Sequence, residues 1–173
     1  MRGAWSIIEA TWAETVLRAR RLDEVLLHQR VNDEWSFVET LRHLIFAHDR
    51  WVRRTILGDT APFHRLGLPP DNKVGVRPDA AVDVSALGVD VLAEATLDDV
   101  LTVRKERTRE VRTIVSGFVN DDLSRVCAPN PALGGLPPSR QVSVQVALDV
   151  LIREEWLHHE FATRDLASLE PAH

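Results

Sequence analysis

Four segments of the chain place apolar residues at intervals of three and four positions, the spacing that aligns one face of an α-helix. They cover residues 4–30, 36–57, 96–118 and 139–169. Capping residues mark two of the starts: Ser36 precedes Glu39 by three positions, as in a capping box, and Thr96 comes directly before an acidic first turn. The spacing therefore predicts an all-α fold built on four long helices.

Two irregular stretches rich in proline and glycine separate these helices. The first covers residues 58–93, with a short helix expected around 80–87, and the second covers 119–139. Gly58 is expected to end the second helix, and Ser139 to begin the last one. Connections of this length favour a four-helix bundle of the up-down-down-up type with long irregular crossovers, formed by residues 1–173 as a single domain.

Charge and composition exclude several classes of protein. The formal net charge is −5 and no strongly basic face is present, which argues against nucleic-acid binding. No apolar run reaches the roughly 20 residues that a membrane span needs. The single cysteine, Cys127, excludes an internal disulfide and is typical of a cytoplasmic protein. We interpret Cys127 as an ordinary loop thiol rather than a nucleophile.

The last helix carries two polar residues in its apolar stripe. Glu155 and His159 lie one turn apart among the apolar residues Leu148, Leu151, Ile152, Ala162 and Leu166. A carboxylate on a buried face is costly unless it is paired, protonated or bound to a metal. The Glu-x-x-x-His spacing places an oxygen and a nitrogen on one side of the helix, which suits a shared metal ion. A buried Glu–His hydrogen bond is the alternative.

A metal site would need a third ligand from another helix. Periodicity places His48 at the centre of the apolar face of the second helix, whereas His43 lies off that face beside Ala47. Spacing alone therefore favours His48 as the buried histidine.

Two segments resemble the DinB-like family of four-helix metalloproteins. They are Trp35-Ser36-Phe37-Val38-Glu39-Thr40-Leu41-Arg42-His43-Leu44 and Glu154-Glu155-Trp156-Leu157-His158-His159. The second is similar to the family's ligand-bearing last helix, where the usual pattern is His-x-x-x-His, so Glu155 is a departure. The chain looks like the branch that includes the mycothiol-dependent maleylpyruvate isomerase. This resemblance implies the ligands His43, Glu155 and His159, with His48 as the alternative to His43.

Supporting roles are predicted for further residues near these ligands. Glu39 could accept the second N–H of His43, although its role in the capping box explains it as well. Arg164 could bind a substrate carboxylate or form an ion pair with Asp165. Trp51 and Trp156 could line the pocket, although core packing is the stronger expectation for both. Ala47 would leave room for a metal or substrate, and His158 would support the ligands or be exposed.

Two histidines and one carboxylate fit Zn²⁺ with an open position, and nickel or iron is an alternative. The resemblance favours zinc and implies a low-molecular-weight thiol, such as mycothiol or bacillithiol, as co-substrate of an S-transferase or isomerase. A metal-dependent hydrolase of a small ester or amide and a non-catalytic binding bundle are the alternatives. The expected partner is a small-molecule substrate, and the apolar face of the first helix would allow a homodimer.

Overall fold

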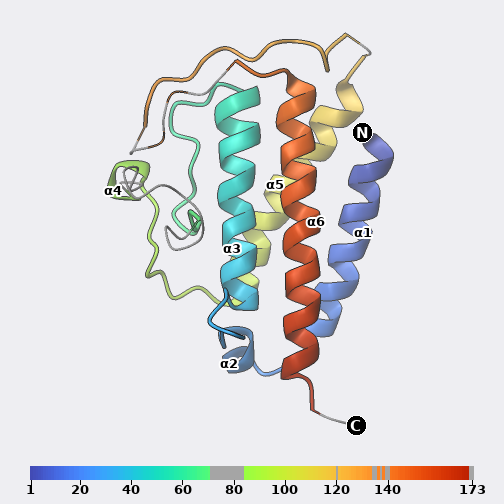
Figure 1. Cartoon of the computed structure of the whole chain (residues 1–173), viewed down its shortest axis with the longest axis vertical. Coiled ribbons are helices and arrows are strands. Elements are labelled where there is room, and N and C mark those ends of the chain that lie inside the picture. Colours follow the sequence, from blue (N-terminus) through green and yellow to red (C-terminus); the bar gives the residue numbers. More distant parts are fainter. Residues whose placement is uncertain (71–83, 120, 134–135, 137, 139–140, 172–173) are drawn as a thin grey trace.

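The computed structural model describes residues 1–70, 84–119, 121–133, 136, 138 and 141–171. Within these residues it is helical, with two isolated β-bridges and no longer strand. Four long helices make up the bundle: α1 (Arg2–Ala19), α3 (Phe37–His48), α5 (Leu97–Gly117) and α6 (Val144–Leu169). Helices α1 and α3 each pack against both α5 and α6. Figure 1 shows α3 and α5 running in one direction and α1 and α6 in the other, so the prediction of an all-α bundle is confirmed.

Local capping explains where two of these helices begin. The Ser36 hydroxyl accepts from the Glu39 N–H (3.2 Å), and the Glu39 carboxylate accepts from the Ser36 N–H (2.9 Å). Thr96 and Asp99 form the same reciprocal pair at the start of α5. Both are complete capping boxes, which satisfy backbone donors that a helix start would otherwise leave free. These two predictions from short sequence patterns are confirmed.

The second helix changes its winding halfway along. After His48 the chain continues as a π-helical segment, η1 (Asp49–Ile56), in which the Leu57 N–H reaches back five residues to the Val52 carbonyl at 3.0 Å. Gly58 then adopts φ +72°, a conformation that glycine tolerates well, and the helical segment ends where predicted. Because π-helical turns shift the register of the side chains that follow, a wheel drawn at 3.6 residues per turn fails beyond His48.

The first helix is shorter than its apolar spacing predicted. Helix α1 ends at Ala19, and a separate short helix, α2 (Glu24–Leu27), follows after Asp23 takes an extended backbone. Neither proline nor glycine marks this break. The apolar spacing continues through it because Leu27 still packs into the core, with 1% of its surface exposed.

The last helix begins later than predicted, and the expected cap, Ser139, lies outside the described residues. Its N-cap is Ser143, and residues before it pair with another loop: the Cys127 N–H donates to the Val142 carbonyl (2.9 Å) and the Val144 N–H to the Arg125 carbonyl (3.0 Å). This long-range pairing keeps residues 141–143 extended. The short helix expected around 80–87 is α4 (Val84–Leu87), and its expected first part lies outside the described residues.

The described parts of the first connection, residues 58–70 and 84–93, lie along α3 on the side away from α1 (Figure 1). The buried Arg42 guanidinium holds them there by donating to the carbonyls of Leu66 (3.0 Å), Asp90 (2.6 Å) and Ala93 (3.2 Å). The Leu68 N–H returns a bond to the Arg42 carbonyl at 3.1 Å. These bonds fix the connection against the turn of α3 that carries the neighbouring His43.

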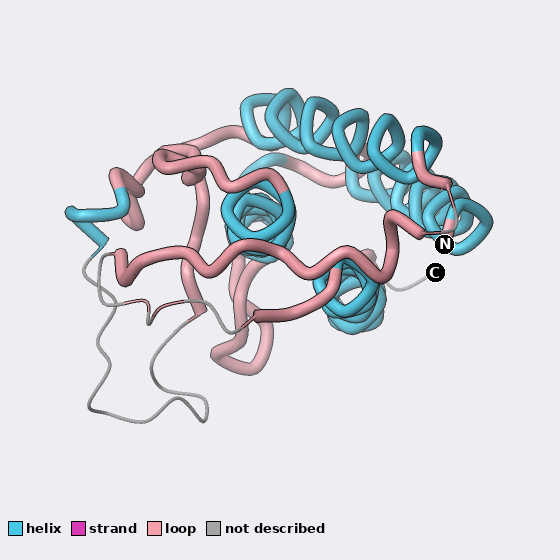
Figure 2. The backbone as a smooth tube through the Cα atoms, turned by 90° about the horizontal axis from the view of Figure 1, so that it is seen from above, coloured by secondary structure: helices cyan, strands magenta, loops and turns pink. Residues whose placement is uncertain are grey.

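The second connection crosses one end of the bundle before the chain enters α6 (Figure 2). No helix in the described part of the chain combines the length and the apolar character needed to cross a membrane.

Candidate metal centre

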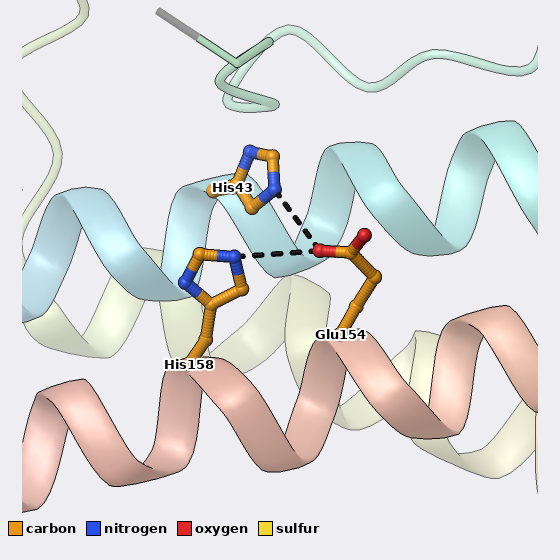
Figure 3. Close-up of side chains that lie close together, drawn as sticks. All are labelled: His43, Glu154 and His158. Atoms are coloured by element: carbon orange, nitrogen blue, oxygen red, sulfur yellow. Dashed lines mark ion pairs between the residues drawn. The ribbon is translucent and has the colours of Figure 1, made fainter. Parts of the chain in front are cut away.

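Three potential ligands from two helices converge between α3 and α6 (Figure 3). The Glu154 carboxylate oxygen Oε2 lies 3.6 Å from His43 Nε2 and 3.4 Å from His158 Nε2. Each residue offers one ligand atom, and all three atoms lie within 4.8 Å of one another. Among the described residues, no other group of three His, Cys, Asp or Glu side chains converges in this way.

A backbone carbonyl sets the tautomer of His43. The Nδ1 atom of His43 lies 3.0 Å from the Leu68 carbonyl oxygen, which can only accept a hydrogen bond. The proton therefore sits on Nδ1, and the lone pair of Nε2 faces Glu154. Histidines that bind metals typically donate their other N–H to such a carbonyl or carboxylate. The connection held by Arg42 thus prepares His43 to act as a ligand.

Trp35 packs over both imidazoles. Its ring centroid lies 4.5 Å from that of His43 and 5.8 Å from that of His158, and the two imidazole centroids are 4.7 Å apart. His43 and His158 are buried, with 6% and 8% of their surface exposed. This packing restricts both rings to orientations in which they face Glu154.

The electrostatics favour the protonation states that bind metals. Hydrogen bonding with His158 holds the pKa of Glu154 well below its ordinary range. Burial lowers the pKa of His43. At neutral pH the site therefore offers a charged carboxylate together with a neutral imidazole at His43, which are the ligating forms of these side chains.

A cavity of about 370 Å³ reaches this cluster. His43 and His158 both line it, and its other walls include Trp35, Thr40, Pro70 and Phe161. Its volume falls within the range of small-molecule sites. Pro70 belongs to the first connection, so this connection contributes to the wall of the cavity.

The family profile of the DinB superfamily matches residues 7–162. The chain belongs to the DinB superfamily. No curated protein and no solved structure matches it significantly. The resemblance to the branch with the mycothiol-dependent isomerase therefore stays a prediction.

This DinB-superfamily chain places Glu155 away from the cluster. Glu155 is buried, as the apolar stripe indicated, but its carboxylate oxygens accept from the Arg104 guanidinium of α5 at 2.7 and 2.8 Å. The cation that the buried carboxylate requires is therefore an arginine. The set His43, Glu155 and His159 does not converge in the structure, and this corrects the expected geometry.

His159 faces α1 instead of α3. Its Nε2 lies 2.8 Å from the Thr15 hydroxyl, and its ring meets Trp12 edge-on with centroids 5.1 Å apart. Trp156, predicted as a pocket wall, is 39% exposed and approaches His159 edge-on rather than the cluster. His158, predicted for the second shell, is the histidine of α6 that lies beside His43.

His48, the alternative ligand, occupies a separate buried cluster. Its Nδ1 lies 3.7 Å from the Asp49 carboxylate and its Nε2 lies 3.5 Å from the Glu110 carboxylate. Arg107 donates to Asp49 at 2.7 Å. The periodicity correctly indicated that His48 is buried, and the structure surrounds it with acidic and basic side chains at the end of α3.

The other residues for which supporting roles were predicted mostly form ion pairs, a helix cap or core contacts. Glu39 pairs with Ser36 and Arg30, whereas the His43 N–H goes to Leu68. Arg164 donates to Asp165 (2.8 Å) and also pairs with Glu34. Ala47 is buried and Trp51 is half-buried against the core.

The residues that sequence reasoning missed carry the same signal one position earlier. Glu154 and His158 also form a Glu-x-x-x-His pair. The apolar stripe gave preference to Glu155 and His159 because it identifies the buried face of α6 without showing which neighbour each side of that face meets.

The buried histidine His48 leads to a prediction about acid stability. Burial lowers its pKa, so the folded state binds a proton at His48 less readily than the unfolded chain does. The groups that face it are Asp49, Glu110 and Arg107. Neutral His48 therefore makes its full contribution to the free energy of unfolding at a pH above the ordinary histidine pKa. This contribution is lost as the pH falls below that pKa.

We expect the urea concentration that half-unfolds the metal-free protein to decrease when the pH is lowered from 7.5 to 5.5. His48 contributes a slope of at most about 1.4 kcal/mol per pH unit. The His48→Phe variant should show a shallower decline, because one titrating group is gone. An equally steep decline in that variant would contradict the assignment to His48.

Proposed function

We propose that His43, Glu154 and His158 bind a divalent metal ion and that the site is catalytic. The observation that carries this proposal is the convergence of two imidazole nitrogens and one carboxylate oxygen beside the cavity. Ligand atoms around a tetrahedral zinc ion lie about 3.3 Å apart, given metal–ligand distances near 2.0–2.1 Å. The distances of 3.4 and 3.6 Å from Glu154 to the two histidines are close to that value.

The three proposed ligands would leave a coordination position of the metal free, as a catalytic metal site requires. Three protein ligands leave at least one position for a substrate or water. Zinc is our first choice, and nickel or iron also suits two imidazoles and one carboxylate. When bound, such a metal supplies Lewis acidity that lowers the pKa of a coordinated water or thiol.

The residues of the chain supply orientation and a protected cavity. Leu68 holds the His43 tautomer, and Trp35 shields both rings from bulk water. The cavity next to them is large enough for a small substrate. Its polar lining includes Asp33 and Glu34, whereas Trp35 and Phe161 offer apolar walls.

We infer that the nucleophile comes from a low-molecular-weight thiol rather than from the protein. The single cysteine, Cys127, is 2% exposed, and burial raises the pKa of its thiol, so it makes a poor nucleophile. A thiol at the site would lose its proton and form a carbon–sulfur bond while the leaving group departs. In an isomerisation, the thiol would add and then leave again.

A comparison of two reactions tests this proposal. The zinc-loaded protein is incubated with 1-chloro-2,4-dinitrobenzene and, in turn, mycothiol, bacillithiol or glutathione, and separately with p-nitrophenyl acetate without thiol. We expect the wild type to catalyse arylation of one of these thiols. His158→Ala should lose this activity, and His159→Ala should retain it. Ester cleavage without thiol would instead support the hydrolase alternative. Loaded protein that is inactive in both assays would contradict the catalytic reading.

A further inference from the structure

A second cavity of about 440 Å³ lies between α1 and α5. None of its lining residues belongs to the cavity at the candidate metal centre. Its apolar walls are formed by Trp12, Ala13, Val16, Leu41 and Leu101. The size and the apolar lining suit a small molecule, since ligand sites of this volume are mostly apolar with a few polar groups.

The charged lining of this α1–α5 groove is strongly positive. It contains Arg104, Lys105, Arg109 and Arg112, against one carboxylate, Glu9. The chain as a whole carries a formal net charge of −5, so this groove differs in sign from the average surface. Charge complementarity therefore favours an anionic occupant.

Two of the four cations are engaged within the protein and two are not. Arg104 forms the buried pair with Glu155, and Arg112 pairs with Glu9 at 2.9 Å. Lys105 and Arg109 are exposed, and no carboxylate of the described residues lies within ion-pair distance of either. They lie four positions apart on α5, which places both on one side of the helix.

Trp12 lines the groove as a largely buried aromatic side chain. It is 6% exposed, and its indole Nε1 is buried without any hydrogen-bond acceptor in the described structure. Buried indole N–H groups usually have a partner. The Arg104 guanidinium lies 5.7 Å from the Trp12 ring centroid, so the apolar wall and the positive charge are in direct contact.

We propose that the α1–α5 groove is a binding site for a small organic anion with an apolar body. The anionic group lies beside Lys105 and Arg109, and the apolar body packs against Trp12, Val16 and Leu101. This groove is separate from the cavity at the candidate metal centre, because the two cavities share no lining residue.

A pair of fluorescent probes tests the proposal on the metal-loaded full chain. The anionic probe is 1-anilinonaphthalene-8-sulfonate, and its neutral counterpart, N-phenyl-1-naphthylamine, has the same aromatic body without the sulfonate. Titrations give the Kd of each. The charge variant is Lys105→Gln with Arg109→Gln, and its matched control is Arg153→Gln, an exposed arginine of α6. Ala13→Trp fills the groove from α1.

We expect the wild type to bind the anionic probe more tightly than the neutral one. The charge variant should weaken anion binding about tenfold, because it removes two exposed cations that face the sulfonate, and should leave neutral-probe binding unchanged. Higher salt should weaken only the anion. Arg153→Gln should behave like the wild type, and Ala13→Trp should abolish binding of both probes.

Three results would overturn the proposal. One is equal affinity of both probes for the wild type, which would make the groove merely apolar. Another is unchanged anion binding in the charge variant. The third is full binding in Ala13→Trp, which would place the probe elsewhere on the protein. Circular dichroism and bound metal, measured for every variant, separate loss of the groove from loss of the fold or of the metal centre.

Discussion

Replacing His158 by alanine is expected to remove metal binding, whereas replacing His159, the next residue, should leave it intact. The His158 imidazole lies 3.4 Å from the Glu154 carboxylate, while His159 is directed to Thr15 of α1. Loss of a residue that merely supports a ligand weakens metal binding 10–100-fold, so loss of a ligand itself should cost at least about 100-fold. The two variants remove the same side chain from adjacent positions of one helix, which makes them a matched pair.

The measurement is the metal content of protein purified without added metal, followed by zinc affinity in competition with a chromophoric chelator. His43→Ala and Glu154→Gln should behave like His158→Ala, and His48→Ala like His159→Ala. Circular dichroism shows whether each variant is folded. Loss of metal in His159→Ala with retention in His158→Ala would support the ligand set predicted from the apolar stripe and refute the one proposed from the structure.

The elements that sequence reasoning predicted correctly are those specified by local chemistry. The capping boxes at Ser36 and Thr96 depend on residues three positions apart, and Gly58 ends its segment through its own backbone conformation. Ser139 failed as a helix start because the following residues pair with the chain around Cys127, more than ten positions away. A local rule cannot detect such a competitor.

The residues predicted on α6 differ by one position from those of the candidate cluster for a related reason. A helical wheel separates buried from exposed positions, but α6 is buried against three neighbours at once. Glu154 and His158 face α3, Glu155 faces Arg104 of α5, and His159 faces α1. Which neighbour meets which side depends on the rotation of the helix, and only the assembled bundle determines it. His43 was identified through the family resemblance, since its position off the apolar face gave no signal from periodicity.

Replacing Glu155 by alanine should destabilise the fold strongly without removing the metal. The variant leaves the Arg104 guanidinium, whose side chain is 10% exposed, buried without its carboxylate. Breaking a buried ion pair from one side costs about 3–5 kcal/mol, because the remaining charge stays out of water. We expect a loss of that size in the free energy of urea unfolding. Glu160→Ala, an exposed glutamate of the same helix, should change it by less than about 0.5 kcal/mol.

The double variant Arg104→Met/Glu155→Leu tests whether the unpaired charge is the cause. If so, removing both charges should recover most of the lost stability, since an apolar pair can replace a buried ion pair at little cost. Double-variant stability no better than that of Glu155→Ala would mean that lost packing, rather than the charge, causes the effect. Metal retained by folded Glu155→Ala would separate the two neighbouring glutamates by role: Glu154 would bind the metal and the buried Glu155 would stabilise the fold. Metal lost from that folded variant would instead return Glu155 to the ligand set.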